Sequence, residues 1–182
     1  KEIIALLPGS REQEVEKMLT LMLSVRDSFK NYQFVIAGAP SLSKEFYQKF
    51  VDDDVHFVSN KTYDLLRCSR AALVTSGTAT LETALLNVPE IVCYRTSKIS
   101  YEIGKRVVKN IKFISLVNLI MDKEVVKELV QNQLNTENLV DELQKILEGP
   151  ERDKMLQDYE LLREKLGGKG ASNHAAEIIV NL

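Results

Sequence analysis

The sequence predicts a doubly wound α/β fold, in which helices cover both faces of a parallel sheet of about six strands. Short apolar runs recur along the chain, and each is continuous rather than alternating in polarity, as in strands that are buried on both faces. Helix-length segments separate most of these runs, and this alternation is typical of parallel sheets with right-handed crossovers. The predicted strands are residues 3–7, 34–37, 55–58, 71–75, 91–94 and 113–117.

The helices and turns are predicted from periodicity and from glycine and proline. The clearest helix runs from Glu12 to Phe29, because its apolar residues repeat at steps of three and four. Turns that contain glycine or proline follow the first, second and fourth strands. We therefore expect a Rossmann-like domain at residues 1–134 and a helical C-terminal tail at residues 135–182, packed on that domain or on a partner domain. The helical stretches predicted after the last strand are residues 123–131, 136–147, 151–166 and 172–180.

The composition excludes several classes of protein. The 182 residues are 45% hydrophobic and 27% charged, with a formal net charge of -2, so neither general disorder nor general nucleic-acid binding is expected. No apolar run is long enough to span a bilayer, and the first residues do not resemble a signal peptide. Cys68 and Cys93, both expected to be buried, are too few for a disulfide scaffold, which favours the cytoplasm. Because the chain opens inside a strand pattern without a Met, we expect a piece of a longer protein.

Two turns between strands and helices carry the candidate binding residues. In an open parallel sheet, ligands bind at the carboxyl ends of the strands where the strand order reverses, here between the first and fourth strands. The first turn contains Gly9, which lets a ligand approach the backbone, and Ser10 and Gln13, which have the spacing of a capping box. Arg11 is a candidate phosphate ligand; a solvated arginine beside the neighbouring glutamates is the alternative.

The second turn, Ser76-Gly77-Thr78-Ala79-Thr80, joins the fourth strand to a helix. Free backbone N–H groups at a helix start, joined by hydroxyl groups, form an anion site. Glu82 lies slightly inside this helix, where it can accept hydrogen bonds from a ribose diol or can compensate the helix dipole. Neither turn matches the dinucleotide fingerprint or the triphosphate-binding loop, which argues against NAD binding and ATP hydrolysis.

A basic segment follows the fifth strand. Residues 95–112 carry six Lys or Arg residues against one Glu, and Ile or Val recurs every four residues, which predicts a basic helix with an apolar stripe. We hypothesise that Lys105, Arg106 and Lys109 bind an anionic membrane surface or guide a phosphorylated lipid. A helix that covers the sheet and has a solvated basic face is the alternative.

No metal site is expected. The acidic run Asp52-Asp53-Asp54 contains an Asp-x-Asp pattern, but it precedes a strand rather than following one and is interpreted as a polar turn. The two histidines, His56 and His174, have no second ligand nearby in the sequence and are interpreted as structural.

Several separated motifs along the chain occur together in one family of proteins. They are Pro8-Gly9-Ser10-Arg11-x-x-Glu14, Ala37-Gly38-Ala39-Pro40, Ser76-Gly77-Thr78-Ala79-Thr80-Leu81-Glu82, Tyr94-Arg95, Leu116-Val117-Asn118-Leu119-Ile120 and Lys127-Glu128-Leu129-Val130-Gln131. Together they resemble the carboxyl-terminal half of lipid-A-disaccharide synthases, and the resemblance covers nearly the whole chain. One difference is visible, since Val117 stands where the family usually has Pro.

That family consists of inverting glycosyltransferases with two Rossmann-like domains, the GT-B fold, whose carboxyl-terminal domain binds the nucleotide of the donor. The resemblance implies that this chain is that half.

The resemblance implies a role for each matching residue. It implies that Arg11 meets the diphosphate of a UDP-sugar, that the Ser76–Thr80 turn lies beside it, and that Glu82 holds the ribose. Three further residues are implied near the diphosphate or the sugar, namely Asn118, Glu128 and Gln131. Their predicted positions agree with this, since Asn118 would follow the sixth strand and the other two would share one helix face. An exposed polar face is the alternative for the latter two.

The resemblance also implies a reaction and its partners. The full enzyme transfers 2,3-diacylglucosamine from UDP to the 6-hydroxyl of 2,3-diacylglucosamine 1-phosphate, with inversion and without a metal or cofactor. The general base is expected in a separate N-terminal domain, so this chain alone is expected to be inactive. The enzyme is expected in the cytoplasm, peripherally on the inner membrane, with a homodimer as one possible assembly. The alternatives are half of a UDP-sugar 2-epimerase and a non-enzymatic nucleotide-sugar-binding module.

Overall fold

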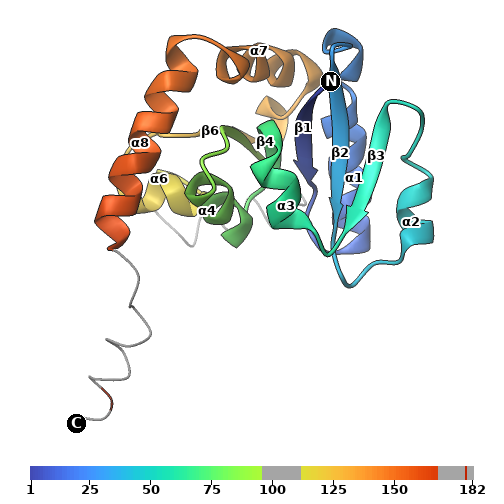
Figure 1. Cartoon of the computed structure of the whole chain (residues 1–182), viewed down its shortest axis with the longest axis horizontal. Coiled ribbons are helices and arrows are strands. Elements are labelled where there is room, and N and C mark those ends of the chain that lie inside the picture. Colours follow the sequence, from blue (N-terminus) through green and yellow to red (C-terminus); the bar gives the residue numbers. More distant parts are fainter. Residues whose placement is uncertain (96–111, 168–178, 180–182) are drawn as a thin grey trace.

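The computed structural model describes residues 1–95, 112–167 and 179, and it has the predicted doubly wound architecture (Figure 1). Parallel strands form one sheet in the order β3-β2-β1-β4-β5-β6. The strand order reverses between β1 and β4, as predicted, and these two strands pair directly, with Ala5 opposite Ala72. The strands are β1 Glu2–Leu7, β2 Tyr32–Gly38, β3 Val55–Ser59, β4 Ser69–Thr75, β5 Glu90–Tyr94 and β6 Lys127–Val130.

Helices lie on both faces of this sheet because alternate strand residues point in opposite directions. Ile4 and Leu6 belong to the core that β1 shares with α1, α7 and α8, whereas Ala5 and Leu7 belong to the core that it shares with α3 and α4. The α-helices are α1 Glu12–Leu23, α2 Lys44–Gln48, α3 Thr62–Arg67, α4 Thr78–Leu85, α6 Leu116–Met121, α7 Thr136–Leu147 and α8 Pro150–Leu166.

The prediction was wrong around the sixth strand. Residues 113–117 were expected to form a strand, but α6 begins at Leu116, where the Ser115 hydroxyl accepts a hydrogen bond from the Asn118 N–H (3.3 Å) as an N-cap. The segment Lys127–Val130, expected to be helical, instead pairs with β5 as the edge strand β6. A strand of four residues at a sheet edge carries too short an apolar run to be told from a helix by its pattern.

Two smaller expectations also failed. The first helix ends at Leu23, and a short 3₁₀ turn, Arg26–Ser28, covers part of the remaining predicted length. The capping box did not form, because Arg11 rather than Ser10 is the N-cap of α1 and no side chain caps that helix. Cys68 is exposed, since it lies at the C-terminal end of the short helix α3, whereas Cys93 is buried as expected.

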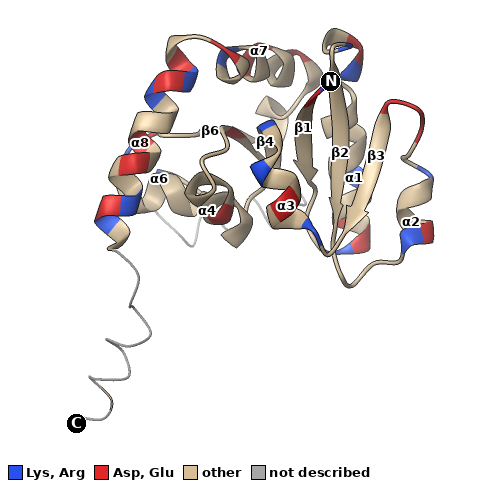
Figure 2. Ribbon diagram, viewed as in Figure 1, with Lys and Arg blue, Asp and Glu red and all other residues tan. Residues whose placement is uncertain are grey.

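The helices after β6 pack onto the same core as the strands. The apolar side chains of α7 and α8, such as Leu143 and Tyr159, belong to the core that contains Ile4 and Ile91. Their outward faces carry most of the charges of this part of the molecule (Figure 2). The predicted boundary near residue 134 stays a prediction. The basic residues Lys105, Arg106 and Lys109, and all but one residue of the stretch 172–180, lie outside the described part of the chain.

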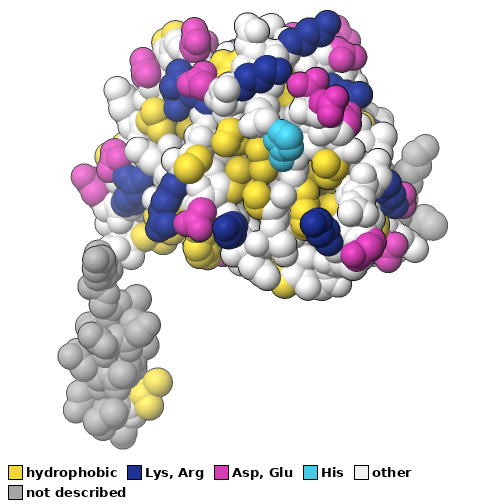
Figure 3. All heavy atoms as spheres, turned by 45° about the vertical axis from the view of Figure 1, so that its right-hand side comes forward, with side chains coloured by type: hydrophobic (Ala, Val, Ile, Leu, Met, Phe, Trp, Pro, Cys, Tyr) yellow, Lys and Arg dark blue, Asp and Glu magenta, His cyan; other side chains and the backbone are white. Residues whose placement is uncertain are grey.

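No helix within the described ranges of the chain combines the length and the apolar character that a bilayer crossing requires. On the side where β3 forms the sheet edge, apolar side chains reach the surface within a rim of charged ones (Figure 3). Exposed apolar side chains are common on the surfaces of globular proteins.

Candidate functional site

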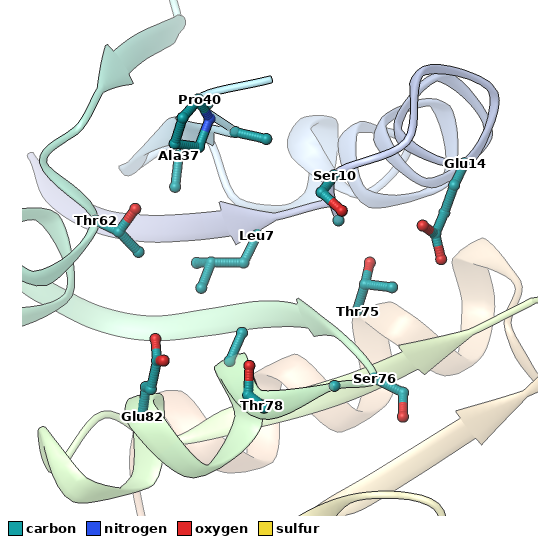
Figure 4. A pocket seen from close by; sticks show the side chains of 15 residues that line it. Leu7, Ser10, Glu14, Ala37, Pro40, Thr62, Thr75, Ser76, Thr78 and Glu82 are labelled. Carbon is teal, nitrogen blue, oxygen red and sulfur yellow. The ribbon is translucent and has the colours of Figure 1, made fainter. Parts of the chain in front are cut away.

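A cavity of about 330 Å³ lies where the strand order reverses, at the carboxyl ends of β1, β2 and β4 (Figure 4). The turns after β1 and β4 face each other across it, as the sequence predicted. Three loops and the first turns of α1, α3 and α4 form its walls. The lining residues are Leu7, Gly9, Ser10, Glu14, Ala37, Gly38, Ala39, Pro40, Thr62, Thr75, Ser76, Gly77, Thr78, Ala79 and Glu82.

The structure gathers most of the predicted site residues here, but not all. Arg11 and Thr80 belong to the two turns without lining the cavity. Three residues that the family resemblance implied, Asn118, Glu128 and Gln131, also lie outside the cavity lining. The roles of all these residues in ligand binding stay predictions.

The turn after β1 depends on a glycine and on a neighbouring carboxylate. Gly9 has a φ of 104°, which side chains rarely adopt, and a Cβ there would lie 3.1 Å from the Glu14 carboxylate. Glu14 therefore closes one end of the cavity directly beneath the turn. The Ser41 hydroxyl donates to the Ser10 carbonyl (3.0 Å) and joins this turn to the loop after β2.

The loop after β2 contains the family motif Ala37-Gly38-Ala39-Pro40, but the sequence did not predict it as part of the site. Gly38 lies against Phe57, since a Cβ there would come within 2.1 Å of the ring. The Ala39 N–H donates to the Tyr47 hydroxyl (3.0 Å), and Tyr47 in turn stacks on Phe57. The buried Tyr47 and the half-buried Phe57 hold the backbone of residues 37–40 at the cavity wall. The signal that could have found it is the Gly-Ala-Pro turn at the end of a buried strand.

The turn after β4 uses its predicted hydroxyl donors internally. The Thr80 hydroxyl is buried and donates to the Gly77 carbonyl (2.9 Å), while the Ser76 hydroxyl donates to the Ile114 carbonyl (3.3 Å). Gly77, with a φ of 155°, is the N-cap of α4, and no side chain caps this helix. Its first N–H groups, at Thr78 and Ala79, are thus available at the cavity.

Arg11 is exposed beside this cavity. It is the N-cap residue of α1, and its carbonyl accepts from the N–H groups of Glu14 and Val15 (2.9 Å each). Within the described ranges its guanidinium forms no ion pair and no hydrogen bond, so the alternative of a pair with a neighbouring glutamate is not seen. Its charge is free to meet an anion.

A second cavity of about 390 Å³ adjoins the first and shares Thr62 and Glu82 with it. Its other lining residues belong to the loop after β3 and to α3, and they include Asn60 and the aromatic ring of Tyr63, which is 52% exposed. Asn60 has a φ of 55°, a left-handed conformation that asparagine tolerates. The sequence did not predict this cavity, because nothing in residues 60–67 departs from the ordinary composition of loops and helices.

Glu128, the second residue of β6, is the centre of a hydrogen-bond network that joins this strand to the start of α6. Its carboxylate accepts from the N–H groups of Ile114 and Ser115 (2.9 Å each), from the Ser115 hydroxyl (2.8 Å) and from the Asn118 side-chain amide (2.8 Å). Asn118 is fully buried, and its Oδ1 accepts from the N–H groups of Val125 (2.7 Å) and Val126 (2.9 Å). Both side chains therefore organise their own surroundings, and neither has the placement that the sequence predicted.

Gln131 lies just after β6 in a left-handed conformation with a φ of 52°, and not on a helix face with Glu128. The Arg95 guanidinium donates to the carbonyls of Gln131 (3.2 Å) and Leu134 (3.1 Å). These contacts fix the backbone of the turn against the end of β5.

The described ranges contain no group of three or more His, Cys, Asp or Glu side chains that could hold a metal ion. In the acidic run, Asp52 accepts from the N–H groups of Asp54 (3.0 Å) and Val55 (3.1 Å), as in a polar turn. These bonds and Arg26 hold the pKa of Asp52 below its ordinary value. His56 is exposed on β3, and His174 lies outside the described residues.

The fold and the cavity at the strand-order reversal define the chain as a Rossmann-like domain of the GT-B type. The family described as lipid-A-disaccharide synthetase matches residues 1–181, and the chain belongs to this family. It is 40% identical to the lipid-A-disaccharide synthase of Syntrophus aciditrophicus, over 98% of this chain and 49% of that protein. For the Myxococcus xanthus enzyme the identity is 34%, with the same coverage. The chain thus spans about half the length of these relatives.

Solved structures share the fold at low sequence identity. The match to the UDP co-structure of Staphylococcus aureus MnaA includes 98% of this chain and 45% of the MnaA chain, with a TM-score of 0.64 and 15% identity. The Neisseria meningitidis UDP-GlcNAc 2-epimerase bound to UDP-GlcNAc covers 100% of this chain and 44% of its own, with a TM-score of 0.59 and 17% identity. The glycosyltransferase VinC in complex with dTDP gives a TM-score of 0.56, with 15% identity over 91% of this chain and 37% of its own.

Proposed function

We propose that this chain is the donor-binding half of an inverting glycosyltransferase that forms the lipid A disaccharide. The observation that carries the proposal is the cavity between the turns after β1 and β4, in a chain that belongs to the lipid-A-disaccharide synthase family. The donor is UDP-2,3-diacylglucosamine and the acceptor is 2,3-diacylglucosamine 1-phosphate. No metal or other cofactor takes part.

The two adjoining cavities suggest how the donor lies. Glu82 is shared by both, so a ribose held there would direct the base into the second cavity, toward Tyr63, and the diphosphate into the first. The first cavity offers the N–H groups at the start of α4, with Arg11 beside it. Helix N-termini and arginine are both suited to phosphate.

The chemical role of this half is to stabilise the leaving group. When the glycosidic bond to UDP breaks, negative charge builds on the diphosphate, and oriented N–H groups and a guanidinium stabilise that charge without reorganising. The general base that activates the acceptor hydroxyl belongs to a separate N-terminal domain, so the 182-residue chain binds UDP without turnover. Incubation with donor and acceptor tests this, since disaccharide formed by the chain alone would contradict it.

Arg11→Ala tests the phosphate assignment. We expect the dissociation constant for UDP, measured by isothermal titration calorimetry, to rise about tenfold, because a charge-assisted hydrogen bond is lost. The matched control is Arg26→Ala, which removes an exposed arginine that pairs with Asp52 away from the cavity. Unchanged UDP affinity in Arg11→Ala would remove the assignment.

Membrane association is part of the proposal, because both substrates carry acyl chains. Lys105, Arg106 and Lys109 supply the positive charge for an anionic surface on the cytoplasmic side of the inner membrane. Neutralising these three residues in the longer protein should weaken its binding to anionic vesicles, and unchanged binding would refute their role.

A UDP-sugar 2-epimerase is the second candidate, favoured by the fold shared with a 2-epimerase bound to UDP-GlcNAc. Product analysis on the longer protein separates the two reactions, since one yields an acylated disaccharide and the other an epimerised sugar. Saturable UDP binding without either product would instead indicate a non-enzymatic binding module.

A further inference from the structure

We propose that Thr75 is a further ligand-binding residue of the first cavity, and that its hydroxyl donates a hydrogen bond to a diphosphate oxygen. This inference rests on the proposed function, since a UDP-sugar supplies the diphosphate. The predicted site began at Ser76, because Thr75 is the last residue of the buried strand β4.

The Thr75 hydroxyl is a buried donor that makes no hydrogen bond within the described ranges. The residue is 7% exposed, and its Oγ1 is shielded from solvent and has no hydrogen-bond partner among the residues that the structure describes. A buried hydroxyl in this state costs free energy relative to a paired one, so native proteins carry few of them. A ligand that supplies an acceptor would remove this cost, and the free protein would retain it.

The hydroxyl faces the space that a ligand would fill. Thr75 lines the cavity, and Figure 4 shows its oxygen directed toward the gap between Ser10 and Glu14. The Glu14 carboxylate lies at the same end of the cavity, but within the described ranges Thr75 donates neither to it nor to any other acceptor.

The chemistry of the surroundings selects a diphosphate over a ribose. Thr75 directly precedes the turn that leads to the free N–H groups at Thr78 and Ala79, whereas Glu82, the candidate ribose ligand, lies toward the second cavity. The neighbouring hydroxyls of Ser76 and Thr80 already donate to backbone carbonyls. Thr75 is therefore the buried hydroxyl of this turn that can still donate to an anion, together with the helix N-terminus.

The test is Thr75→Val, which keeps the shape of the side chain and removes the hydroxyl. We expect its dissociation constant for UDP to rise about tenfold, as for the loss of a hydrogen bond to a charged group. We also expect the melting temperature of the free protein to stay unchanged or to rise, because the substitution removes no hydrogen bond that the described part of the folded chain makes. A residue with a purely structural role would not combine these two effects.

Thr83→Val is the matched control. Thr83 is fully buried on α4, the helix that follows the turn after Thr75; its hydroxyl donates to the Ala79 carbonyl (2.7 Å), and it does not line the cavity. This change should lower the melting temperature and leave UDP affinity unchanged. Thr75→Ser, which restores a hydroxyl, should bind UDP within about twofold of the parent chain.

The probes locate the partner of the hydroxyl. Thr75→Val should weaken the binding of UDP and of inorganic pyrophosphate and leave uridine binding unchanged. Equal UDP affinity in Thr75→Val and the parent, a loss confined to uridine, or a melting temperature lowered as much as in Thr83→Val would each overturn the inference. If the parent chain itself did not bind UDP, the proposed function would fail, and the pyrophosphate and melting measurements would still decide on Thr75.

Discussion

At the scale of single residues, burial without a partner determines the charge of Glu90. Glu90 is fully buried at the start of β5, and neither of its carboxylate oxygens has a hydrogen-bond partner among the described residues. Burial raises its pKa well above the ordinary value of 4.5. The buried Cys93 and Tyr159 lie in the same electrostatic environment, and their pKa values are also raised, mainly by burial and then by Glu90. The folded chain therefore keeps the Glu90 proton to a higher pH than the unfolded chain does.

Glu90→Gln should therefore stabilise the protein in a pH-dependent way. Above pH 4.5 the unfolded chain loses the Glu90 proton while the folded chain keeps it, so the parent's free energy of unfolding falls as pH rises. The glutamine variant lacks this loss. Its advantage should be near zero at pH 4 and grow by up to about 1.4 kcal/mol per pH unit above 4.5. Urea unfolding across pH 4–8 measures it, and parallel pH profiles for the two chains would contradict the prediction.

At the scale of elements, the Glu128 network links β6 to the turn after β4. Glu128 holds the N–H groups of Ile114 and Ser115, and the Ile114 carbonyl accepts from the Ser76 hydroxyl at the cavity. We propose that this chain of contacts makes Glu128 a positioning residue for the turn that contains Ser76.

Glu128→Gln should lower the free energy of unfolding by about 2 kcal/mol, because the amide cannot accept from all of these donors. UDP affinity should fall about threefold, and this fall should largely vanish in a Ser76→Ala background, since the coupling runs through Ser76. Denaturation and calorimetry measure the two effects. Additive losses of affinity in the double variant would show a direct contact instead.

Glu124→Gln is the matched control for this change. Glu124 is exposed and forms an ion pair with Lys127, three residues further along the chain (3.1 Å). Exposed ion pairs of this kind contribute little to the free energy of unfolding. Its stability should change by less than about 0.5 kcal/mol, with no effect on UDP.

The elements also show what the sequence can and cannot predict. Strands β1 to β5 were predicted because each carries a short apolar run, and turns with glycine or proline follow β1, β2 and β4; the cavity followed from the alternation of strands with helices. The order of α6 and β6 was not predicted, because β6 has only four residues and because the apolar run before α6 resembles a strand. Nor could composition show that Ser76 and Thr80 would use their hydroxyls internally, or that Thr75 would be left unpaired, since hydrogen-bond partners depend on tertiary contacts.

At the scale of the whole molecule, the helices after β6 are held to the sheet by arginines as well as by the core. Arg152, near the start of α8, donates to the carbonyls of Arg70 (2.7 Å) and Ile146 (2.9 Å), so it joins β4 to the end of α7. Arg70 donates in turn to the Leu147 carbonyl (2.9 Å). The last carbonyls of α7 therefore find their partners outside the helix, on side chains of β4 and α8.

Because one core runs through the sheet, α7 and α8, the described chain should unfold in one cooperative transition. Arg152→Met should lower its free energy of unfolding by about 2–3 kcal/mol, since two partly buried carbonyls lose their donor, and should keep a single transition. Lys154→Met, an exposed change on the same helix, should stay within about 0.5 kcal/mol of the parent. Circular dichroism follows the helices and tyrosine fluorescence follows the core around Tyr47 and Tyr159. If the helical signal melted before the tyrosine signal, α7 and α8 would form a separate unit, and the core that they share with the sheet would contribute little to holding them there.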